Sequence, residues 1–158
     1  MPLLRLLLVL LSVGAAACGD ARTPAIYVMR HLDTPAGVRD PDLTEQGRRN
    51  AERLSEWFRG KRLAAIYVSD YKRTRQTVAP LAARLELSPK TYDPRDTPGL
   101  LARVREETGP VLVVGHSDTV PDIVERLGGT RPAPLAHPDF GDVWIVEGGK
   151  TERVDLRE

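Results

Sequence analysis

Two histidines follow short apolar runs that have the composition of buried strands, and they are the best candidates in this chain for chemistry. Arg30 and His31 come directly after the run Ala25–Met29, and His116 follows the run Val111–Gly115. In an open parallel sheet, ligands bind at the carboxyl ends of the strands. The two histidines are therefore predicted to share one crevice, although they are far apart along the chain.

Two arginines give the crevice its expected ligand. The guanidinium groups of Arg30 and Arg73 form planar forks that match the oxygens of phosphate or sulfate. A neutral imidazole is a competent nucleophile toward phosphorus, and a second, protonated imidazole would stabilise the charge on a transferred phosphoryl group. These residue types together predict phosphoryl transfer, which asks a protein mainly for positioning and positive charge.

Strands and helices are predicted to alternate along the chain. The expected strands are 25–30, 64–68, 90–93, 111–115, 142–147 and 151–156. The expected helices are 45–59 after a cap at Thr44, a helix that ends at Leu85 after a cap at Ser69 or Asp70, 97–107 and 118–127. This alternation predicts an α/β fold, a three-layer α/β/α sandwich whose mostly parallel sheet carries a C-terminal antiparallel hairpin.

The second of these helices begins with an unusual charge pattern. Lys72 and Arg73 lie in its first turn, where basic side chains oppose the helix dipole. The pattern is explained if the helix N-terminus and Arg73 share a bound anion.

The residues before the first strand predict export. Residues 1–17 combine one basic residue, an apolar stretch and three alanines, which is typical of a signal peptide and too short to span a bilayer. Cys18, the only cysteine, stands where a bacterial lipoprotein carries its lipidated residue. We expect a periplasmic or cell-envelope protein that is either anchored by a lipid on Cys18 or soluble, with a short tether at 18–24 and one domain at 25–158.

The composition narrows the choice of partners. The chain has 23 basic and 22 acidic residues and a net charge of +1, which gives no reason to expect a nucleic-acid partner. A membrane contact is expected only through the lipid on Cys18. Three histidines and one cysteine without ligand spacing predict no metal site, and no cofactor is expected.

Four blocks of the sequence resemble the histidine phosphatase superfamily, which includes phosphoglycerate mutases and acid phosphatases. The family's Arg-His signature corresponds to Arg30 and His31, and its Asp-x-x-Leu-Thr-x-x-Gly block corresponds to residues 40–47. Its Ser-x-x-x-Arg-x-x-Gln-Thr block corresponds to residues 69–77, and its Val-x-Gly-His-Ser block to residues 113–117. The four blocks occur in the family's order, and the short chain is more similar to the small phosphatases of the family than to its mutases.

The resemblance implies a role for each matched residue. His31 would accept the phosphoryl group, and Arg30, Arg73 and His116 would complete the phosphate pocket. Thr34 and Ser117 adjoin the two histidines and are expected to contact substrate, although each could instead cap the turn or helix that follows it. His137 is interpreted as a structural or substrate-flanking residue.

A general acid is needed to protonate an alkoxide leaving group. Many members of the resembled family use an acid in a segment whose nearest counterpart here is 93–96. Asp96 is therefore the first candidate for the general acid, and Asp93, in the same segment, is another. Asp118, two residues after His116, is a rival. If no carboxylate serves, substrates with good leaving groups would be favoured.

These observations predict a metal-independent phosphatase that hydrolyses a phosphomonoester or a phosphohistidine through a phosphohistidine intermediate at His31. The expected partner is a phosphorylated small molecule or a phosphoprotein. Two alternatives stay open: a phosphotransferase similar to phosphoglycerate mutase, and a phosphate-binding envelope protein with little turnover.

Overall fold

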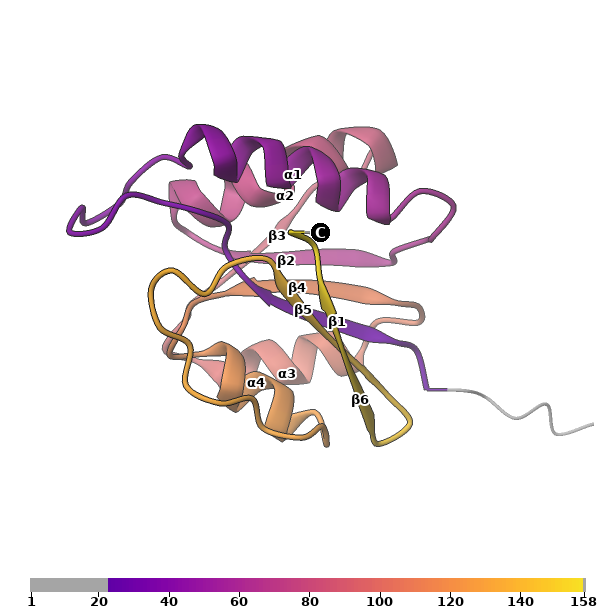
Figure 1. Cartoon of the computed structure of the whole chain (residues 1–158). Helices are drawn as coiled ribbons and strands as arrows, with labels where there is room; N and C mark the ends of the chain where they lie inside the picture. Colours follow the sequence, from indigo (N-terminus) through magenta and orange to yellow (C-terminus); the bar gives the residue numbers. More distant parts are fainter. Residues whose placement is uncertain (1–22, 158) are drawn as a thin grey trace, which may run out of the picture.

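The chain folds into a single six-stranded sheet with helices on both faces (Figure 1). The computed structural model describes residues 23–157, so the predicted signal peptide and Cys18 lie outside the described residues. The elements in chain order are β1 (Ile26–Arg30), α1 (Glu45–Trp57), β2 (Ala65–Ser69), α2 (Lys72–Leu85), β3 (Lys90–Tyr92), α3 (Thr97–Arg105), β4 (Val111–Gly115), α4 (Val120–Arg126), β5 (Asp142–Glu147) and β6 (Lys150–Asp155).

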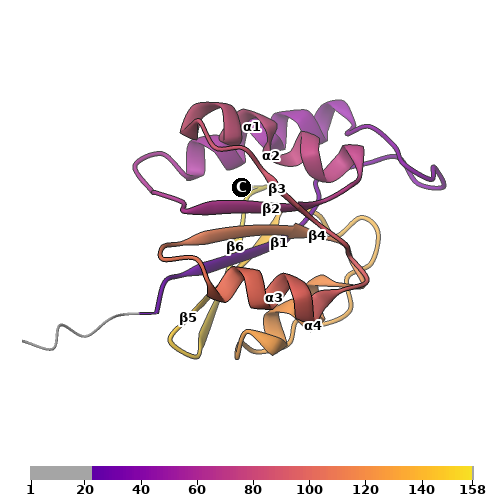
Figure 2. The ribbon, with the colours of Figure 1, turned by 180° about the vertical axis from the view of Figure 1, so that it is seen from behind.

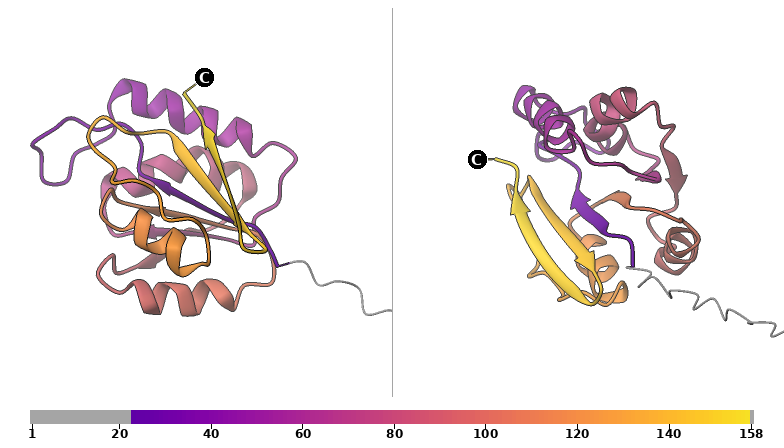
Figure 3. Two further views of the ribbon diagram at one scale, coloured as in Figure 1. Left: turned by 60° about the horizontal axis from the view of Figure 1, so that its bottom comes forward. Right: turned by 90° about the vertical axis from the view of Figure 1, so that its right-hand side faces the viewer.

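The sheet has the strand order β3-β2-β4-β1-β5-β6. Strands β1 to β4 are parallel, whereas β5 pairs antiparallel with both β1 and β6. The C-terminal hairpin therefore forms one edge of the sheet (Figure 3). This arrangement confirms the predicted α/β sandwich with an antiparallel C-terminal pair.

Each face of the sheet packs against one pair of helices. Helices α1 and α2 cover one face, and α3 and α4 cover the other (Figures 1 and 2). Neighbouring residues of β1 point to opposite sides, so Met29 lies in the core beneath α1 and α2, and Val28 lies in the core against α3 and α4. Burial on both faces explains why β2 and β4 are continuous apolar runs.

Helix α1 begins as the sequence predicts. The Thr44 hydroxyl accepts a hydrogen bond from the Gly47 backbone N–H at 3.0 Å, which is the capping contact expected of a threonine at this position. Ala51 and Leu54, three residues apart on the helix, then pack into the core together with Phe58 at the C-cap.

Helix α2 does not begin as predicted, because neither Ser69 nor Asp70 caps it. Its N-cap residue is Tyr71, which makes no side-chain capping bond. The carboxylate of Asp40, from the loop after β1, accepts a hydrogen bond from the Lys72 backbone N–H at 3.1 Å instead. The Ser69 hydroxyl is occupied elsewhere, so a residue distant in sequence supplies the cap. The helix continues through Pro80.

Helix α4 starts two residues later than predicted, at Val120 rather than Asp118. The Thr119 hydroxyl accepts a hydrogen bond from the His116 backbone N–H at 2.9 Å, so residues 116–119 form a turn before the helix. Among residues 23–157, no helix has the length and apolar character needed to cross a membrane.

Candidate active site

The carboxyl ends of β1 and β4 open into a cavity of about 670 Å³. The loops that follow β1 and α4 lie at this same end of the sheet (Figure 1). The expected residues that line the cavity are Arg30, His31, Thr34, Arg73, His116, Ser117 and Asp118. Two residues 85 positions apart in sequence, His31 and His116, have ring centroids 5.5 Å apart. The fold thus brings the two strand-end histidines together.

His31 is held as a neutral imidazole with one free nitrogen. Its Nδ1 lies 2.9 Å from the carbonyl oxygen of Leu32, which can only accept, so Nδ1 carries the proton and Nε2 keeps its lone pair. The side chain is 5% exposed. Burial lowers the pKa of His31 to about 3, and the positive charge of Arg30 acts in the same direction. At neutral pH this geometry leaves Nε2 available as a nucleophile.

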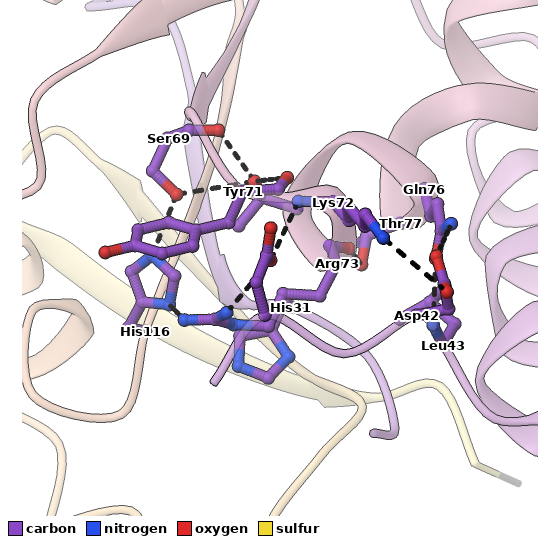
Figure 4. Close-up of polar contacts among 12 residues, drawn as sticks. His31, Asp42, Leu43, Ser69, Tyr71, Lys72, Arg73, Gln76, Thr77 and His116 are labelled. Carbon is purple, nitrogen blue, oxygen red and sulfur yellow. Dashed lines mark hydrogen bonds and ion pairs between the residues drawn. The ribbon is translucent and has the colours of Figure 1, made fainter. Parts of the chain in front are cut away.

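His116 is also neutral and has the opposite tautomer. The guanidinium Nη2 of Arg73 donates to Nδ1 at 3.2 Å, so the proton of His116 lies on Nε2, which donates to the Ser69 hydroxyl at 2.8 Å (Figure 4). Burial and then Arg73 lower the pKa of His116 to about 4. Burial and the positive charge of Arg73 both act against the protonated second imidazole that the sequence predicts.

Arg73 is directed by its neighbours on three sides. Besides its bond to His116, its Nη1 lies 3.5 Å from the carboxylate Oδ1 of Asp40, and its guanidinium carbon lies 4.3 Å above the ring of Tyr71. The same carboxylate caps α2. Asp40, the first residue of the 40–47 block, therefore supplies a negative charge beside the basic first turn. The binding of a separate anion there stays a prediction.

Arg30 reaches across to the loop that precedes β5. Its Nη1 donates to the carbonyl oxygens of Ala136 at 2.8 Å and Asp139 at 3.2 Å. Its guanidinium carbon lies 4.2 Å from the centroid of the Phe140 ring. The Nε atom is buried and has no hydrogen-bond partner among the described residues.

The last two residues of the 69–77 block hold the loop after β1. The Leu32 backbone N–H donates to the Thr77 hydroxyl at 3.0 Å. The Leu43 backbone N–H donates to the Gln76 amide oxygen at 2.8 Å, and the Gln76 amide nitrogen donates to Asp42 at 2.7 Å (Figure 4). Gln76 and Thr77 therefore fix both ends of the segment that follows His31, and neither lines the cavity.

Comparison with known proteins agrees with this geometry. Residues 26–95 match the family model of the histidine phosphatase superfamily (branch 1), and this region includes Arg30, His31 and Arg73. Over these residues the chain is similar to the histidine phosphatase superfamily. His116 lies beyond the matched residues, and the structure places its ring 5.5 Å from that of His31, as the strand-end positions predict. A comparison with curated protein sequences found no match.

Several solved structures share the fold. The protein histidine phosphatase SixA in complex with tungstate is 20% identical, with a TM-score of 0.64 over 84% of this chain and 97% of that chain. A mycobacterial glucosyl-3-phosphoglycerate phosphatase in complex with VO3 is 15% identical, with a TM-score of 0.68 over 84% of this chain and 98% of that chain. Bacillus stearothermophilus YhfR is 19% identical, with a TM-score of 0.61 over 84% and 96%. At these identities the likeness concerns the fold.

The first candidate for the general acid, Asp96, is not among the residues that line the site cavity. Its exposed carboxylate Oδ1 accepts a hydrogen bond from the Gly99 backbone N–H at 2.9 Å, which makes it the N-cap of α3. The assignment of Asp96 is corrected for this reason. An Asp followed by Pro98 in the first helical turn is a capping signal that the sequence already contained.

The other two candidates for the general acid, Asp93 and Asp118, lie in different places. Asp93 pairs with Arg95 at 3.2 Å and lines an adjoining cavity rather than the site. Asp118 is exposed and is the only carboxylate among the residues that line the site cavity. Within residues 23–157, no cluster of three or more His, Cys, Asp or Glu side chains is arranged to hold a metal ion.

Sequence reasoning did not single out several lining residues. Tyr71 packs edge-on against the His116 ring with centroids 5.2 Å apart, and no local pattern marks it. Arg39 and Arg95 add two exposed cations to the lining. His137 is a flanking residue as interpreted: it lines the cavity, and its Nε2 donates to the Thr34 carbonyl oxygen at 3.1 Å.

Proposed function

We propose that this protein is a metal-independent phosphatase that hydrolyses a phosphomonoester or a phosphohistidine through a phosphohistidine intermediate at His31. One observation carries the proposal: a neutral imidazole with a free Nε2 lies in the same cavity as two guanidinium groups and a second imidazole. The match of residues 26–95 to the histidine phosphatase superfamily supports a phosphatase.

In the first step, Nε2 of His31 attacks phosphorus while the bond from phosphorus to the leaving group breaks, and the electron pair of that bond leaves with the leaving group. The hydrogen bond from Nδ1 to Leu32 supports the positive charge that develops on the ring. Arg30 and Arg73 are the donors for the phosphoryl oxygens. His116 donates its Nε2–H to Ser69 and orients Arg73 by accepting a hydrogen bond at Nδ1. In the second step, water attacks phosphorus and the N–P bond breaks, with its electron pair returning to Nε2. Inorganic phosphate is released and neutral His31 is regenerated.

Asp118 is the carboxylate that could assist the leaving group, because it is the only one among the lining residues. As an acid it would donate its proton to an alkoxide oxygen in the first step and take a proton from water in the second. Asp118 is exposed, so substrates whose leaving groups depart without a proton, such as aryl phosphates or a phosphorylated imidazole, are expected to react fastest.

The experiment is phosphate release from p-nitrophenyl phosphate by residues 18–158 in the presence of EDTA. We expect turnover by the wild type and a loss of more than about a thousandfold in His31→Ala. Asp118→Asn is expected to lower kcat for an alkyl phosphate more than for the aryl phosphate. Tight vanadate binding without turnover would instead favour a phosphate-binding protein.

Phosphoglycerate distinguishes the remaining alternative. A phosphatase releases inorganic phosphate from it, whereas a mutase returns the phosphoryl group to the other hydroxyl of the same carbon skeleton. Isomerisation without phosphate release would replace the proposed hydrolysis with phosphoryl transfer. Proteins that carry phosphohistidine provide the matching test for a phosphoprotein substrate.

The site of action is proposed from the sequence. The signal-like segment 1–17 and Cys18 support export to the periplasm or cell envelope, with a lipid on Cys18 as the membrane contact. Fractionation of cells that express the full chain and Cys18→Ser tests both points. Membrane association that is lost in Cys18→Ser supports lipidation, and recovery of the wild type in the soluble periplasmic fraction supports simple cleavage.

A further inference from the structure

The turn formed by residues 136–140 belongs to none of the four sequence blocks, yet it contacts both residues of the Arg-His pair. Arg30 donates through Nη1 to two of its carbonyl oxygens, 106 and 109 positions away in sequence. Phe140 lies under the Arg30 guanidinium and has its ring centroid 5.7 Å from that of His31. The turn is therefore a wall of the site built from a distant part of the chain.

A side chain within the turn fixes its shape. The carboxylate Oδ2 of Asp139 accepts a hydrogen bond from the Ala136 backbone N–H at 2.7 Å. The Asp139 backbone N–H in turn donates to the Ala136 carbonyl oxygen at 2.8 Å. This reciprocal pair holds the two carbonyl oxygens that receive Arg30 in one orientation. The bond from His137 to Thr34 ties the same turn to the loop after His31.

Contacts with the turn, rather than hydrogen bonding by all of its N–H groups, set the position of the Arg30 side chain. An arginine has five N–H donors and loses considerable rotamer freedom when it is fixed. Here Nη1 is taken by the turn, and Nε is buried with no partner among the described residues. A buried donor without a partner is unfavourable, so other contacts must hold the guanidinium in place. Those contacts are the two carbonyl oxygens and the Phe140 ring.

We propose that the 136–140 turn is the positioning element for Arg30, with Asp139 and Phe140 as positioning residues that hold the guanidinium so that Nη2 faces a phosphoryl group in the cavity. The inference rests on the proposed function for its substrate but concerns anion binding, which is measured independently of turnover. Asp139 acts through the turn and Phe140 acts through stacking, and neither lines the site cavity.

The first test is vanadate affinity in two variants of Asp139. Asp139→Ala removes the acceptor for the Ala136 N–H and is expected to weaken vanadate binding about tenfold, because a misplaced binding group is costly. Asp139→Asn keeps an oxygen at the same position and is expected to restore binding to within about twofold of wild type. Equal weakening in both variants would assign the effect to charge and overturn positioning by the turn.

A double-mutant cycle separates positioning from general damage to the fold. Arg30→Ala alone is expected to weaken vanadate binding by about 10- to 100-fold, as for a lost charged hydrogen bond. If Asp139 acts through Arg30, adding Asp139→Ala to Arg30→Ala changes the vanadate dissociation constant by less than about twofold. Additive losses would show that Asp139 acts by another route and would overturn the proposal.

Phe140→Leu provides a second variant if Asp139→Ala does not fold. It keeps an apolar group of similar bulk beneath Arg30 and removes the aromatic face, with an expected weakening of about threefold. A wild-type protein that binds vanadate without turnover would reject the proposed function and leave the positioning result valid. Unchanged affinity in both Asp139→Ala and Phe140→Leu, or no vanadate binding by the wild type, would overturn the positioning role.

Discussion

Mild acid is expected to destabilise this fold, because His31 and His116 are buried in their neutral forms. In the unfolded chain each histidine takes up a proton near its ordinary pKa of 6.5. In the folded protein, burial lowers the pKa to about 3 for His31 and about 4 for His116. Between these values the unfolded state binds more protons than the folded state, so the free energy of unfolding falls as the pH falls.

The size of the effect follows from the two shifts. Both side chains are less than a tenth exposed, at 5% for His31 and 8% for His116, so solvent screening changes it little. From pH 7 to pH 5, each histidine is expected to remove about 2 kcal/mol from the free energy of unfolding, and the pair about 4 kcal/mol. That loss is a large share of the roughly 5–15 kcal/mol that stabilises a typical domain.

Urea unfolding followed by circular dichroism at pH 7, 6 and 5, with ionic strength held constant, measures this loss. His31→Asn keeps an amide N–H for the Leu32 carbonyl oxygen but does not titrate. Likewise, His116→Gln offers an N–H to Ser69 and an oxygen to Arg73. Each variant is expected to halve the loss between pH 7 and pH 5, and the double variant to remove most of it.

Two results would refute the reasoning. The first is a wild-type free energy of unfolding that stays constant between pH 7 and pH 5. The second is a double variant that loses as much stability as the wild type over the same interval, because titration elsewhere would then explain the acid sensitivity. If His31→Asn is already unfolded at pH 7, the test uses His116→Gln alone, which is expected to halve the loss.

Three further predictions concern residues around the site. Asp96→Ala is expected to lower the free energy of unfolding by about 1 kcal/mol through loss of the α3 cap and to leave kcat/KM within about twofold; a loss of activity above tenfold would return Asp96 to the reaction. Thr77→Val leaves the buried Leu32 N–H without its acceptor and is expected to cost about 1–3 kcal/mol in urea unfolding, whereas Thr77→Ser should cost less. Asp40→Asn keeps an oxygen for the Lys72 N–H but removes the charge beside Arg73, so vanadate should bind about threefold more tightly; weaker binding would show that the Asp40 charge is needed to orient Arg73.

The sequence predicted the sheet because its signals are local. Apolar runs of five residues identified β1 and β4, and the parallel topology required their carboxyl ends to lie at the same edge. Boundaries were less exact where a distant residue took part. Helix α2 lacks a local cap because Asp40 supplies one, and the turn around Thr119 delays α4.

Residue roles were harder to predict where two local functions compete for one side chain. The resemblance of segment 93–96 to a family segment suggested an acid at Asp96, but Asp96 uses its oxygen to cap α3 and lies outside the cavity. The residues that line the cavity without belonging to a block, such as Tyr71, carry no spacing signal. The path of the folded backbone brings these residues to the cavity, and no periodic pattern in the sequence predicts it.

The sequence by itself therefore determined the fold class and the identity of the four side chains at the centre of the site. Residue type, hydrophobic period and the edge rule for parallel strands are all properties of short segments. The tertiary structure alone decided the burial that lowers the pKa of His116, the pairing of Arg73 with Asp40 and the anchoring of Arg30 on the 136–140 turn. Burial and long-range contact set these properties, and both arise only when segments distant in sequence pack together.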